Sequence, residues 1–306
     1  MNKQTNLDTR YIDIGAAFSN EPPMMDFVLP GFLAGTVGIL ASPGAAGKTW
    51  LALELCCAVA SPKANHHLFG MRLSNFGQAV FLSAEDPEIA LQSRLYAIAK
   101  HLDDDARAEV QANLKIASLV GLPTDLDPRR NRETDPEPED WSKTICTQCA
   151  GARLIILDTL SRWHTRDENA NSEMSLIIKK AEFVAKATGA SVLFLHHANK
   201  GMIMAGRGDE QQSVRGASAL VDNARWQATL VGMSKDEAKE HGLAGQPGER
   251  ERHRRFVVTK QNHGVTFEPV WLRRGDGGVL LRADLQEGTP ASTTKATRGR
   301  GFNGQM

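Results

Sequence analysis

Residues 41–50, with the sequence ASPGAAGKTW, have the composition of a phosphate-binding loop. Such a loop turns backbone N–H groups toward an anion at the start of a helix, and its usual pattern is G-x-x-x-x-G-K-[ST]. Ser42 stands at the first glycine position, where a small residue can still begin the turn. We assign nucleotide contact to the loop and its flanks, that is to Ser42, Pro43, Gly44, Ala45, Ala46, Gly47, Lys48, Thr49 and Trp50.

Two residues of this loop can do specific chemistry. Lys48 is expected to reach the β- and γ-phosphates of a nucleotide, and Thr49 to place its hydroxyl on Mg²⁺. Gly47 allows the backbone to turn tightly and to approach the phosphates without a Cβ atom. A glycine-rich turn before a core helix is the structural alternative, and it does not account for the lysine.

Three more polar residues follow apolar stretches of the chain. Asp158 comes directly after RLIIL and suits an acid that holds Mg²⁺. Glu85 follows the stretch 78–83, and a carboxylate there can orient and deprotonate an attacking water. His197 ends the stretch 191–197 and could sense a γ-phosphate through a hydrogen bond. Ordinary strand-end acids and a structural histidine are the alternatives.

The elements around these residues must bring them to one place. Four apolar stretches suit buried strands, at 35–40, 78–83, 153–158 and 191–197. Segments with helical character alternate with them, at 50–60, 88–101, 103–113, 141–151 and 173–189; further strands are expected at 114–119, 225–232 and 255–259. The order predicts an α/β fold with a mainly parallel central sheet flanked by helices. The chemistry then belongs beyond the carboxyl ends of the strands.

Two internal segments are expected to lie outside this pattern. Residues 61–77 are interpreted as a loop, and the charged, proline-rich residues 121–140 as a mobile surface excursion. The chain is divided into an N-terminal arm at 1–20, one large domain at 21–285 and a tail at 286–306. The tail is low in apolar residues, which predicts disorder.

Charge and composition limit the function classes. The 306 residues include 36 Lys plus Arg and 36 Asp plus Glu, so the net charge is zero and no general attraction to nucleic acid is indicated. No apolar stretch approaches the roughly 18 residues of a membrane span, and the polar N-terminus lacks a signal core. We expect a cytoplasmic protein without membrane contact.

The four cysteines do not form the framework of a disulfide-rich fold. Cys56 and Cys57 lie in the apolar helical stretch and are interpreted as core residues. Cys146 and Cys149 form a single C-x-x-C, and no second cysteine pair or histidine pair is well placed to complete a zinc site. A helical segment before the next strand is therefore favoured over a metal site.

Six blocks occur in one order along the chain: ASPGAAGKT, FLSAEDP, LIILDTLSRWH, VLFLHHANKG, RGASALVDNARWQ and WLRRGDGGVL. Together they resemble the RepA family of hexameric plasmid replication helicases, in the RecA/DnaB-like group of ring ATPases. The resemblance covers about residues 20–282 and implies a RecA-like P-loop NTPase core. It implies a homohexameric ring that uses ATP and Mg²⁺ to move along single-stranded DNA and unwind duplex during plasmid replication. A replication initiator and a primase are the further partners it allows.

The same resemblance implies roles by position. It makes Lys48 and Thr49 the Walker A pair, Glu85 the catalytic glutamate, Asp158 the Walker B acid, His197 the sensing histidine and Arg225 an arginine finger. Such a finger acts on the γ-phosphate held by a neighbouring subunit. Many relatives in the wider group carry K-x-R late in the domain, whereas residues 260–262 here read Lys-Gln-Asn. This departure shifts the finger role to Arg225, with Lys260 assisting.

Two loops are expected to face the channel of the implied ring. One carries Arg162 and Arg166, and the other carries Lys200, Arg207 and Arg215. Their cations could grip DNA phosphates without reading sequence. Both loops also contain acids, so the grip should be moderate and sensitive to salt; plain exposed surface is the alternative for each arginine.

Two other functions stay open. A RecA-like regulatory or assembly ATPase would switch a protein partner without unwinding DNA, and the zero net charge and small size are compatible with it. A small-molecule kinase would need an acceptor pocket and a lid, which no segment clearly supplies.

Overall fold

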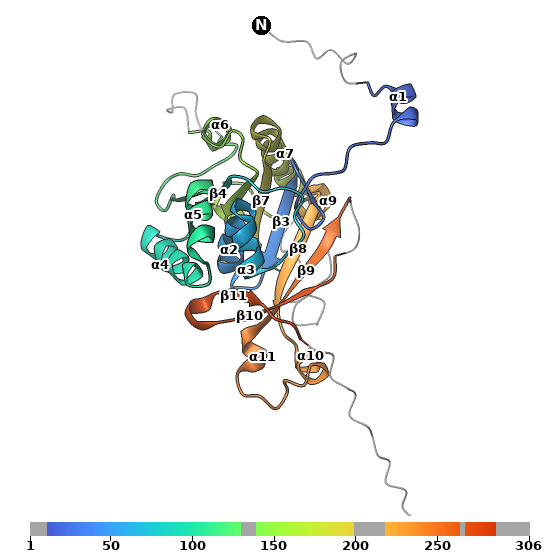
Figure 1. Cartoon of the computed structure of the whole chain (residues 1–306). Coiled ribbons are helices and arrows are strands. Elements are labelled where there is room, and N and C mark those ends of the chain that lie inside the picture. Colours follow the sequence, from blue (N-terminus) through green and yellow to red (C-terminus); the bar gives the residue numbers. More distant parts are fainter. Residues whose placement is uncertain (1–10, 130–138, 199–217, 264–266, 286–306) are drawn as a thin grey trace, which may run out of the picture.

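A nine-stranded sheet dominates the computed structural model, which describes residues 11–129, 139–198, 218–263 and 267–285 (Figure 1). Its strand order is β11-β10-β9-β8-β3-β7-β6-β4-β5, and β1 and β2 form a separate pair. The strands are β1 (Phe27–Leu29), β2 (Phe32–Leu33), β3 (Val37–Ser42), β4 (Ala79–Ser83), β5 (Leu114–Ser118), β6 (Leu154–Asp158), β7 (Ser191–His197), β8 (Trp226–Gly232), β9 (His253–Gln261), β10 (Val270–Arg274) and β11 (Leu280–Arg282).

The sheet is parallel from β5 through β4, β6, β7 and β3 to β8. Strands β9, β10 and β11 then continue it in antiparallel fashion. The prediction of a mainly parallel sheet is confirmed. Because the parallel strands all point the same way, their carboxyl ends form one edge, and the phosphate loop follows β3 at that edge.

Helices cover both faces of the sheet. The described helices are α1 (Ile14–Ser19), which lies away from the sheet, and α2 (Lys48–Ala60), α3 (Pro62–Leu68), α4 (Glu88–Ala99), α5 (Asp104–Asn113), α6 (Trp141–Gln148), α7 (Asn171–Thr188), α9 (Ser218–Asn223), α10 (Lys235–Glu240) and α11 (Glu249–Arg252), with 3₁₀ turns at Leu160–Arg162 and Asp276–Gly278. Strand β6 shows the layering: Leu154 and Ile156 join the core that contains α2, and Ile155 and Leu157 join the core that contains α7. Each such buried side chain contributes roughly 1.5–3 kcal/mol of transfer free energy.

Helix α2 is apolar on nearly all sides and is buried along almost its whole length, as its sequence predicts. Helix α7 is amphipathic and ends at Gly189, whose φ of 79° is the left-handed conformation that the predicted glycine cap requires. These two helices lie on opposite faces of the sheet and hold the central strands between them.

The interpretation of residues 61–77 as a loop is wrong in part, because helix α3 occupies Pro62–Leu68. The Ser61 hydroxyl accepts a hydrogen bond from the Ala64 backbone N–H at 3.0 Å, which caps the helix. Pro62 stands at the first helical position, where its missing N–H costs nothing. Ser61 followed by Pro62 was therefore a helix start rather than a break.

The interpretation of residues 121–140 as a surface excursion is wrong for residues 124–126, which are buried. Leu126 is completely buried, and Thr124 and Asp125 are each 7% exposed. Residues 124–126 thus pack against the domain, residues 121–123 and 129 are exposed, and residues 130–138 lie outside the described residues.

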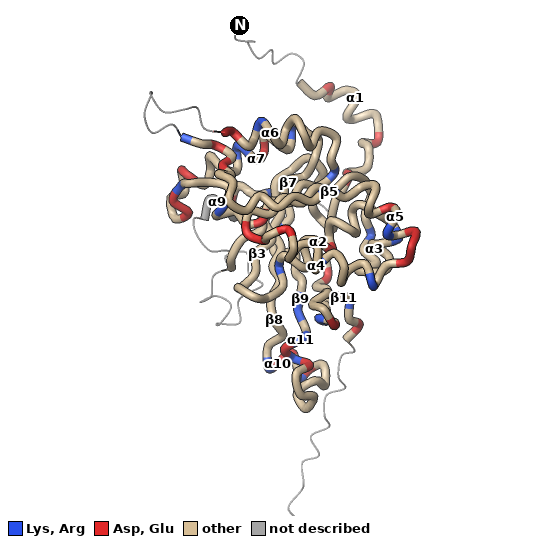
Figure 2. The backbone as a smooth tube through the Cα atoms, turned by 90° about the vertical axis from the view of Figure 1, so that its left-hand side faces the viewer, with Lys and Arg blue, Asp and Glu red and all other residues tan. Residues whose placement is uncertain are grey.

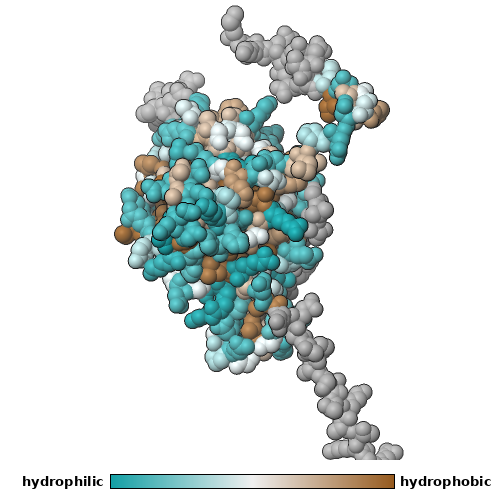
Figure 3. Space-filling view, viewed as in Figure 1, coloured by the Kyte–Doolittle hydropathy of each residue, from teal (hydrophilic) through white to brown (hydrophobic). Residues whose placement is uncertain are grey.

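Helix α1 lies apart from the sheet and its helices (Figure 1). Its Ile14 and Phe18 side chains are 58% and 87% exposed, and Figure 3 shows hydrophobic residues next to hydrophilic ones in this part of the surface. The predicted arm includes α1, whereas residues 1–10 and 286–306 lie outside the described part. The division into arm, domain and tail stays a prediction.

Acidic and basic residues are interspersed over the described chain (Figure 2). Helices α3 and α5, for example, are joined by an ion pair between Lys63 and Asp105 at 2.7 Å. Cys146 lies in α6 and Cys149 ends it, and the described residues hold no group of three or more metal-binding side chains. No described helix has the length and apolar character needed to cross a lipid bilayer.

Candidate nucleotide-binding site

The phosphate loop joins the end of β3 to the start of α2. Gly47 has a φ of 106°, a conformation that favours glycine, and a Cβ atom there would lie 2.7 Å from Nη2 of Arg274 and displace that side chain. Ser42 is the last residue of β3 and its φ is not positive. Its hydroxyl donates to the Pro43 carbonyl oxygen at 3.1 Å. The serine at the first position therefore needs no glycine-only conformation.

Lys48 lies inside this site with little solvent. The residue is 7% exposed, and its Nζ donates to the Thr159 hydroxyl at 3.4 Å. Burial lowers the pKa of Lys48, and the negative charges of Asp158 and Glu85 act in the opposite direction. A buried ammonium group whose hydrogen-bond partner is a neutral hydroxyl is electrostatically suited to an incoming phosphate.

Thr49 and Asp158 meet at the carboxyl edge of the sheet. The Thr49 hydroxyl donates to Asp158 Oδ2 at 3.1 Å. Asp158 is fully buried, and its Oδ1 has no hydrogen-bond partner among the described residues. Burial raises the pKa of Asp158 to about 6, while the Lys48 charge lowers it. A hydroxyl beside a buried carboxylate with a spare oxygen is a donor set that fits Mg²⁺.

Glu85 and Asp86 follow β4, and only Asp86 is held in an ion pair with a described residue. Strand pairing puts Ser83 opposite Asp158, so both acids lie beside the Walker B position. Asp86 accepts a two-point ion pair from Arg94, and its backbone N–H donates to the Ser83 hydroxyl at 3.0 Å. Glu85 is exposed and has no partner in the described part of the chain. Within the described chain, Glu85 is thus the acid of the two that is not held in an ion pair, and its role as the base stays a prediction.

His197 lies at the same edge as the loop. It pairs with Ser42 in the register of β3 and β7, and the next residue, Ala198, donates its backbone N–H to the Ser42 carbonyl at 2.9 Å. The imidazole is half-buried. The structure therefore brings His197 beside the loop, and its role as a phosphate sensor stays a prediction.

Arg225 lies at the opposite edge of the sheet. Its backbone N–H donates to the carbonyl oxygen of Val37, the first residue of β3, at 2.9 Å, and its side chain is exposed. Ser42 ends the same strand, about 16 Å further along at 3.3 Å per residue. The structure therefore does not bring Arg225 to the phosphate loop of its own chain.

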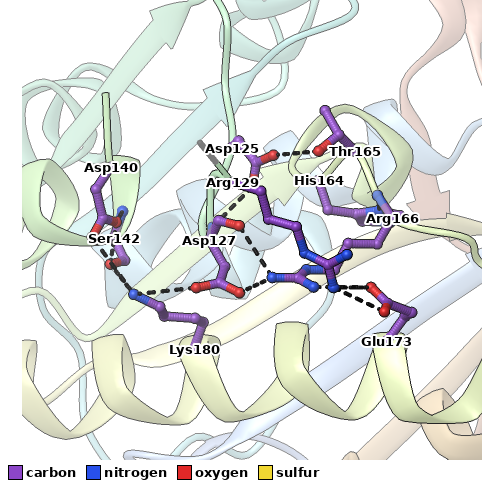
Figure 4. Close-up of polar contacts among 10 residues, drawn as sticks. All are labelled: Asp125, Asp127, Arg129, Asp140, Ser142, His164, Thr165, Arg166, Glu173 and Lys180. Atoms are coloured by element: carbon purple, nitrogen blue, oxygen red, sulfur yellow. Dashed lines mark hydrogen bonds and ion pairs between the residues drawn. The ribbon is translucent and has the colours of Figure 1, made fainter. Parts of the chain in front are cut away.

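Arg162 and Arg166 differ sharply. Arg162 is exposed, has no side-chain partner among the described residues and lines a cavity of about 870 Å³ together with Arg129. The Arg166 side chain is 5% exposed and donates to Asp127 and to Glu173, the latter at 2.9 Å (Figure 4). The expectation that Arg166 faces a channel disagrees with this burial. Lys200, Arg207 and Arg215 lie outside the described residues.

Arg166 belongs instead to a network that holds residues 124–129, which we call the strap. In the strap, Leu126 donates its N–H to the Trp163 carbonyl at 3.0 Å, and Asp125 accepts a hydrogen bond from the Thr165 hydroxyl at 2.9 Å. Figure 4 shows Arg129, Glu173 and Lys180 joining the same network. The strap thus supports the segment that follows Asp158.

Two arginines at the site were given no role from the sequence. Arg254 donates through Nε to the Ala46 carbonyl at 3.0 Å, and Arg274 donates through Nη2 to the Ala45 carbonyl at 3.4 Å. Both come from the antiparallel part of the sheet. Arg274 stands in the block WLRRGDGGVL, but the pattern does not indicate that it contacts the loop.

Comparison with known proteins bears on the identity of this fold. Residues 4–202 match the family model of the AAA domain, which is well over half of the 306 residues. The chain belongs to the AAA domain family. The prediction of an ATP-hydrolysing enzyme agrees with this membership and with the loop geometry.

Three solved structures are similar to the chain. One is an ATPase domain with a TM-score of 0.57 and 13% identity, and the match covers 92% of this chain and all of that one. A DnaB-like replicative helicase, described with its interactions with primase, has a TM-score of 0.60 and 14% identity over 91% of this chain and 70% of that one. The KaiC-like protein PH0186 from Pyrococcus horikoshii has a TM-score of 0.52 and 16% identity over 86% of this chain and all of that one. These likenesses confirm the predicted RecA-like P-loop fold.

Proposed function

We propose that this AAA domain chain is a replicative DNA helicase subunit, which hydrolyses ATP at subunit interfaces of a homohexameric ring to move along single-stranded DNA. The observation that carries the proposal is the distribution of the site. Lys48, Thr49, Asp158 and Glu85 gather at one sheet edge, and Arg225 lies exposed at the other. A site divided in this way suits hydrolysis between subunits.

Each residue at the carboxyl edge has a defined task. Lys48 neutralises phosphate charge, and the loop N–H groups hold the phosphate oxygens. Thr49 and Asp158 would hold Mg²⁺, which when bound offsets the negative charge of the phosphates. Glu85 orients the attacking water and accepts its proton. His197, at the end of β7, donates a hydrogen bond to the γ-phosphate.

Arg225 is assigned to the neighbouring subunit. It stabilises the charge that develops on the neighbour's γ-phosphate, which is the task of an arginine finger. Its distance from the loop of its own chain supports action in trans. Lys260 lies nearby and donates to the Asp222 carbonyl at 2.9 Å, in helix α9, which precedes Arg225.

Single-stranded DNA is the proposed track. Arg162 supports this assignment, because an exposed guanidinium that has no partner in the described chain and lies beside a cavity can hold a backbone phosphate. Likeness to the DnaB-like replicative helicase supports a role in replication, and the interactions of that helicase with primase support a primase as a partner. We base two further proposals, action during plasmid replication and recognition of an initiator, on the resemblance of the six sequence blocks to the RepA family.

Two assays test the proposal together. We expect ATP hydrolysis that single-stranded DNA stimulates, and displacement of one strand from a forked duplex. Lys48→Ala should reduce hydrolysis about 100-fold or more, because it removes the cation that meets the transferred phosphoryl group. Arg107→Ala is a matched control, since Arg107 forms an exposed ion pair with Asp104 within helix α5, away from the phosphate loop.

The second candidate is a RecA-like ATPase that regulates a protein partner without unwinding DNA. The fold likeness to the KaiC-like protein and the zero net charge favour it. The same assays separate the two functions. Hydrolysis that depends on Lys48, with no response to any oligonucleotide and no strand displacement, would select the regulatory ATPase.

A further inference from the structure

The phosphate loop is held from outside by two arginines of the same chain. Arg254, near the start of β9, donates through Nε to the Ala46 carbonyl at 3.0 Å. Its Nη1 also donates to the carbonyls of Glu251 at 2.7 Å and His253 at 2.8 Å. This side chain therefore bridges the loop and the start of β9 through three backbone oxygens.

Arg274 makes the second contact. It ends β10, and its Nη2 donates to the Ala45 carbonyl at 3.4 Å. The same nitrogen lies so close to Gly47 that any Cβ atom there would collide with it. The Arg274 Nε is buried without a partner among the described residues. Arg274 is thus packed directly on the tightest turn of the loop.

The location of these contacts has a chemical meaning. A phosphate loop binds an anion through N–H groups that point inward, so its carbonyl oxygens must find partners elsewhere. Ala45 has a φ of 61°, which is a costly conformation for a residue with a side chain. Two guanidinium groups on the carbonyls of Ala45 and Ala46 can stabilise that conformation without occupying the N–H side.

A buried acid fixes the strand that carries Arg274. Glu54, in α2, is completely buried, and its Oε1 accepts a hydrogen bond from the Leu280 backbone N–H at 2.8 Å. Leu280 is the β11 partner of Arg274 in the strand register. In the turn between these strands, Gly278 packs so closely on the Trp50 ring that a Cβ would lie 2.8 Å from it. The β10–β11 hairpin is therefore anchored to the helix that begins at the loop.

The two arginines also concentrate positive charge behind the loop. Burial lowers the pKa of Arg254, and the nearby Arg274 charge lowers it further, while Glu251 opposes this. Arg250 and Glu251 line the same cavity of about 260 Å³ as Arg254 and form an ion pair with each other. A polyphosphate on the inner side of the loop would relieve the repulsion between the two guanidinium groups.

We propose that Arg254 and Arg274 are positioning residues of the phosphate loop, holding its carbonyl side so that its N–H groups stay turned toward a nucleotide, with Glu54 fixing the strand that carries Arg274. The inference rests on the proposed nucleotide site. It assigns both arginines to binding of the nucleotide and not to the chemical step.

The test measures the Kd for a fluorescent ATP analogue and the steady-state kcat and KM for ATP. Arg254→Ala and Arg274→Ala should each raise Kd and KM about tenfold, the effect of losing one charge-assisted hydrogen bond to the loop, with kcat changed less than about threefold. Arg254→Lys should recover less than half of the loss, because an ammonium cannot bridge three carbonyl oxygens. Arg282→Ala is the control; that side chain contacts the Phe69 carbonyl and Asp284 in the same hairpin.

Several results would overturn the proposal. Kd within twofold of wild type for both alanine variants would remove the positioning role, and so would a fall in kcat at unchanged Kd. Full recovery by Arg254→Lys would mean that charge alone matters. Thermal unfolding shows whether each variant folds, and Arg274→Ala carries the test if Arg254→Ala does not fold.

Lys48→Ala keeps this inference separate from the proposed function. If the Lys48→Ala variant binds and hydrolyses ATP like wild type, residues 41–50 are not a functional phosphate loop. The proposed function itself then fails. If Lys48→Ala is inactive while both arginine variants behave like wild type, only the positioning role fails.

Discussion

The hydroxyl of Thr49 donates to Oδ2 of Asp158 at 3.1 Å, and Oδ1 of the same carboxylate is buried with no partner in the described structure. Burial raises the pKa of Asp158 to about 6, so ionising this group in the folded chain costs free energy. One oxygen of this buried carboxylate therefore lacks, among the described residues, a partner that would offset its negative charge. A divalent cation bound to Oδ1 would supply the missing positive charge, which gives a reason for a carboxylate at this buried position.

Replacing Asp158 should therefore separate activity from stability. Asp158→Asn should lower Mg²⁺-dependent hydrolysis about 100-fold, because the carboxylate charge that would hold the ion is lost. In EDTA at pH 7.5 the same variant should be more stable by about 1 to 3 kcal/mol, since the folded chain no longer has to ionise a buried carboxyl group at position 158. Calorimetry with and without Mg²⁺ measures the second effect. A variant less stable than wild type in EDTA would contradict this account of Asp158.

Arg225 should act in trans. Arg225→Ala and Lys48→Ala should each be nearly inactive alone, but mixed subunits should recover hydrolysis at interfaces that pair an intact Arg225 with an intact Lys48. Random mixing at equal ratio makes about a quarter of the interfaces complete. Arg252→Ala mixed with Lys48→Ala is the matched control. Its hydrolysis should only fall in proportion to the fraction of Lys48→Ala subunits, without any recovery. No recovery at any mixing ratio would argue against the finger.

Arg166 should matter for stability. Its guanidinium joins Asp127 and Glu173 across the strap and α7, and removing it leaves two carboxylates close together (Figure 4). Arg166→Met should lower the Tm by about 5 °C, because partly buried ion pairs cost more to break than exposed ones. Lys143→Ala removes an exposed pair with Asp140 and should change Tm by less than about 1 °C. Equal shifts for the two variants would refute the strap's role.

Glu54 should make stability depend on pH. Burial raises the pKa of Glu54 well above its usual value, although the hydrogen bond from Leu280 and the charge of Arg274 lower it. The unfolded chain releases this proton near pH 4.5, whereas the folded chain retains it, so the contribution of Glu54 to stability falls as pH rises above that point. Glu54→Gln removes the effect.

The Tm of Glu54→Gln relative to wild type should therefore rise between pH 5 and pH 8. Differential scanning fluorimetry at four pH values gives this difference directly, and the titration of Asp158 cancels because both proteins contain it. A difference in Tm that is constant, or that falls with pH, would show that the pKa of Glu54 is not raised in the folded chain.

The location of a residue could be predicted from the sequence where that location follows from the strand that the residue ends. Ser42, Asp158 and His197 each end an apolar strand, and parallel pairing then forces them to one edge of the sheet. The choice of Glu85 over Asp86 stays a prediction; the structure shows that Asp86, and not Glu85, is paired with Arg94. Their chemical roles stay predictions, because geometry shows proximity and not turnover.

Residues whose partners are distant along the chain could not be predicted. Arg166 was expected at a channel, but its partner Asp127 lies 39 positions earlier in a segment that reads as polar surface. Arg254 reaches a loop carbonyl 208 positions away through antiparallel strands whose place in the sheet has no local signal. Helix α3 was missed for a different reason, because proline begins helices as well as ending them.

The position of Arg225 at the amino edge has a consequence for assembly. In the proposed ring, Arg225 of each copy serves the phosphate loop of the next copy, and repeating that one contact around the ring joins successive copies head to tail. A lone protomer then has no finished catalytic centre, and a pair finishes just one. Turnover per polypeptide should accordingly climb with protein concentration and level off only when the last copy meets the first.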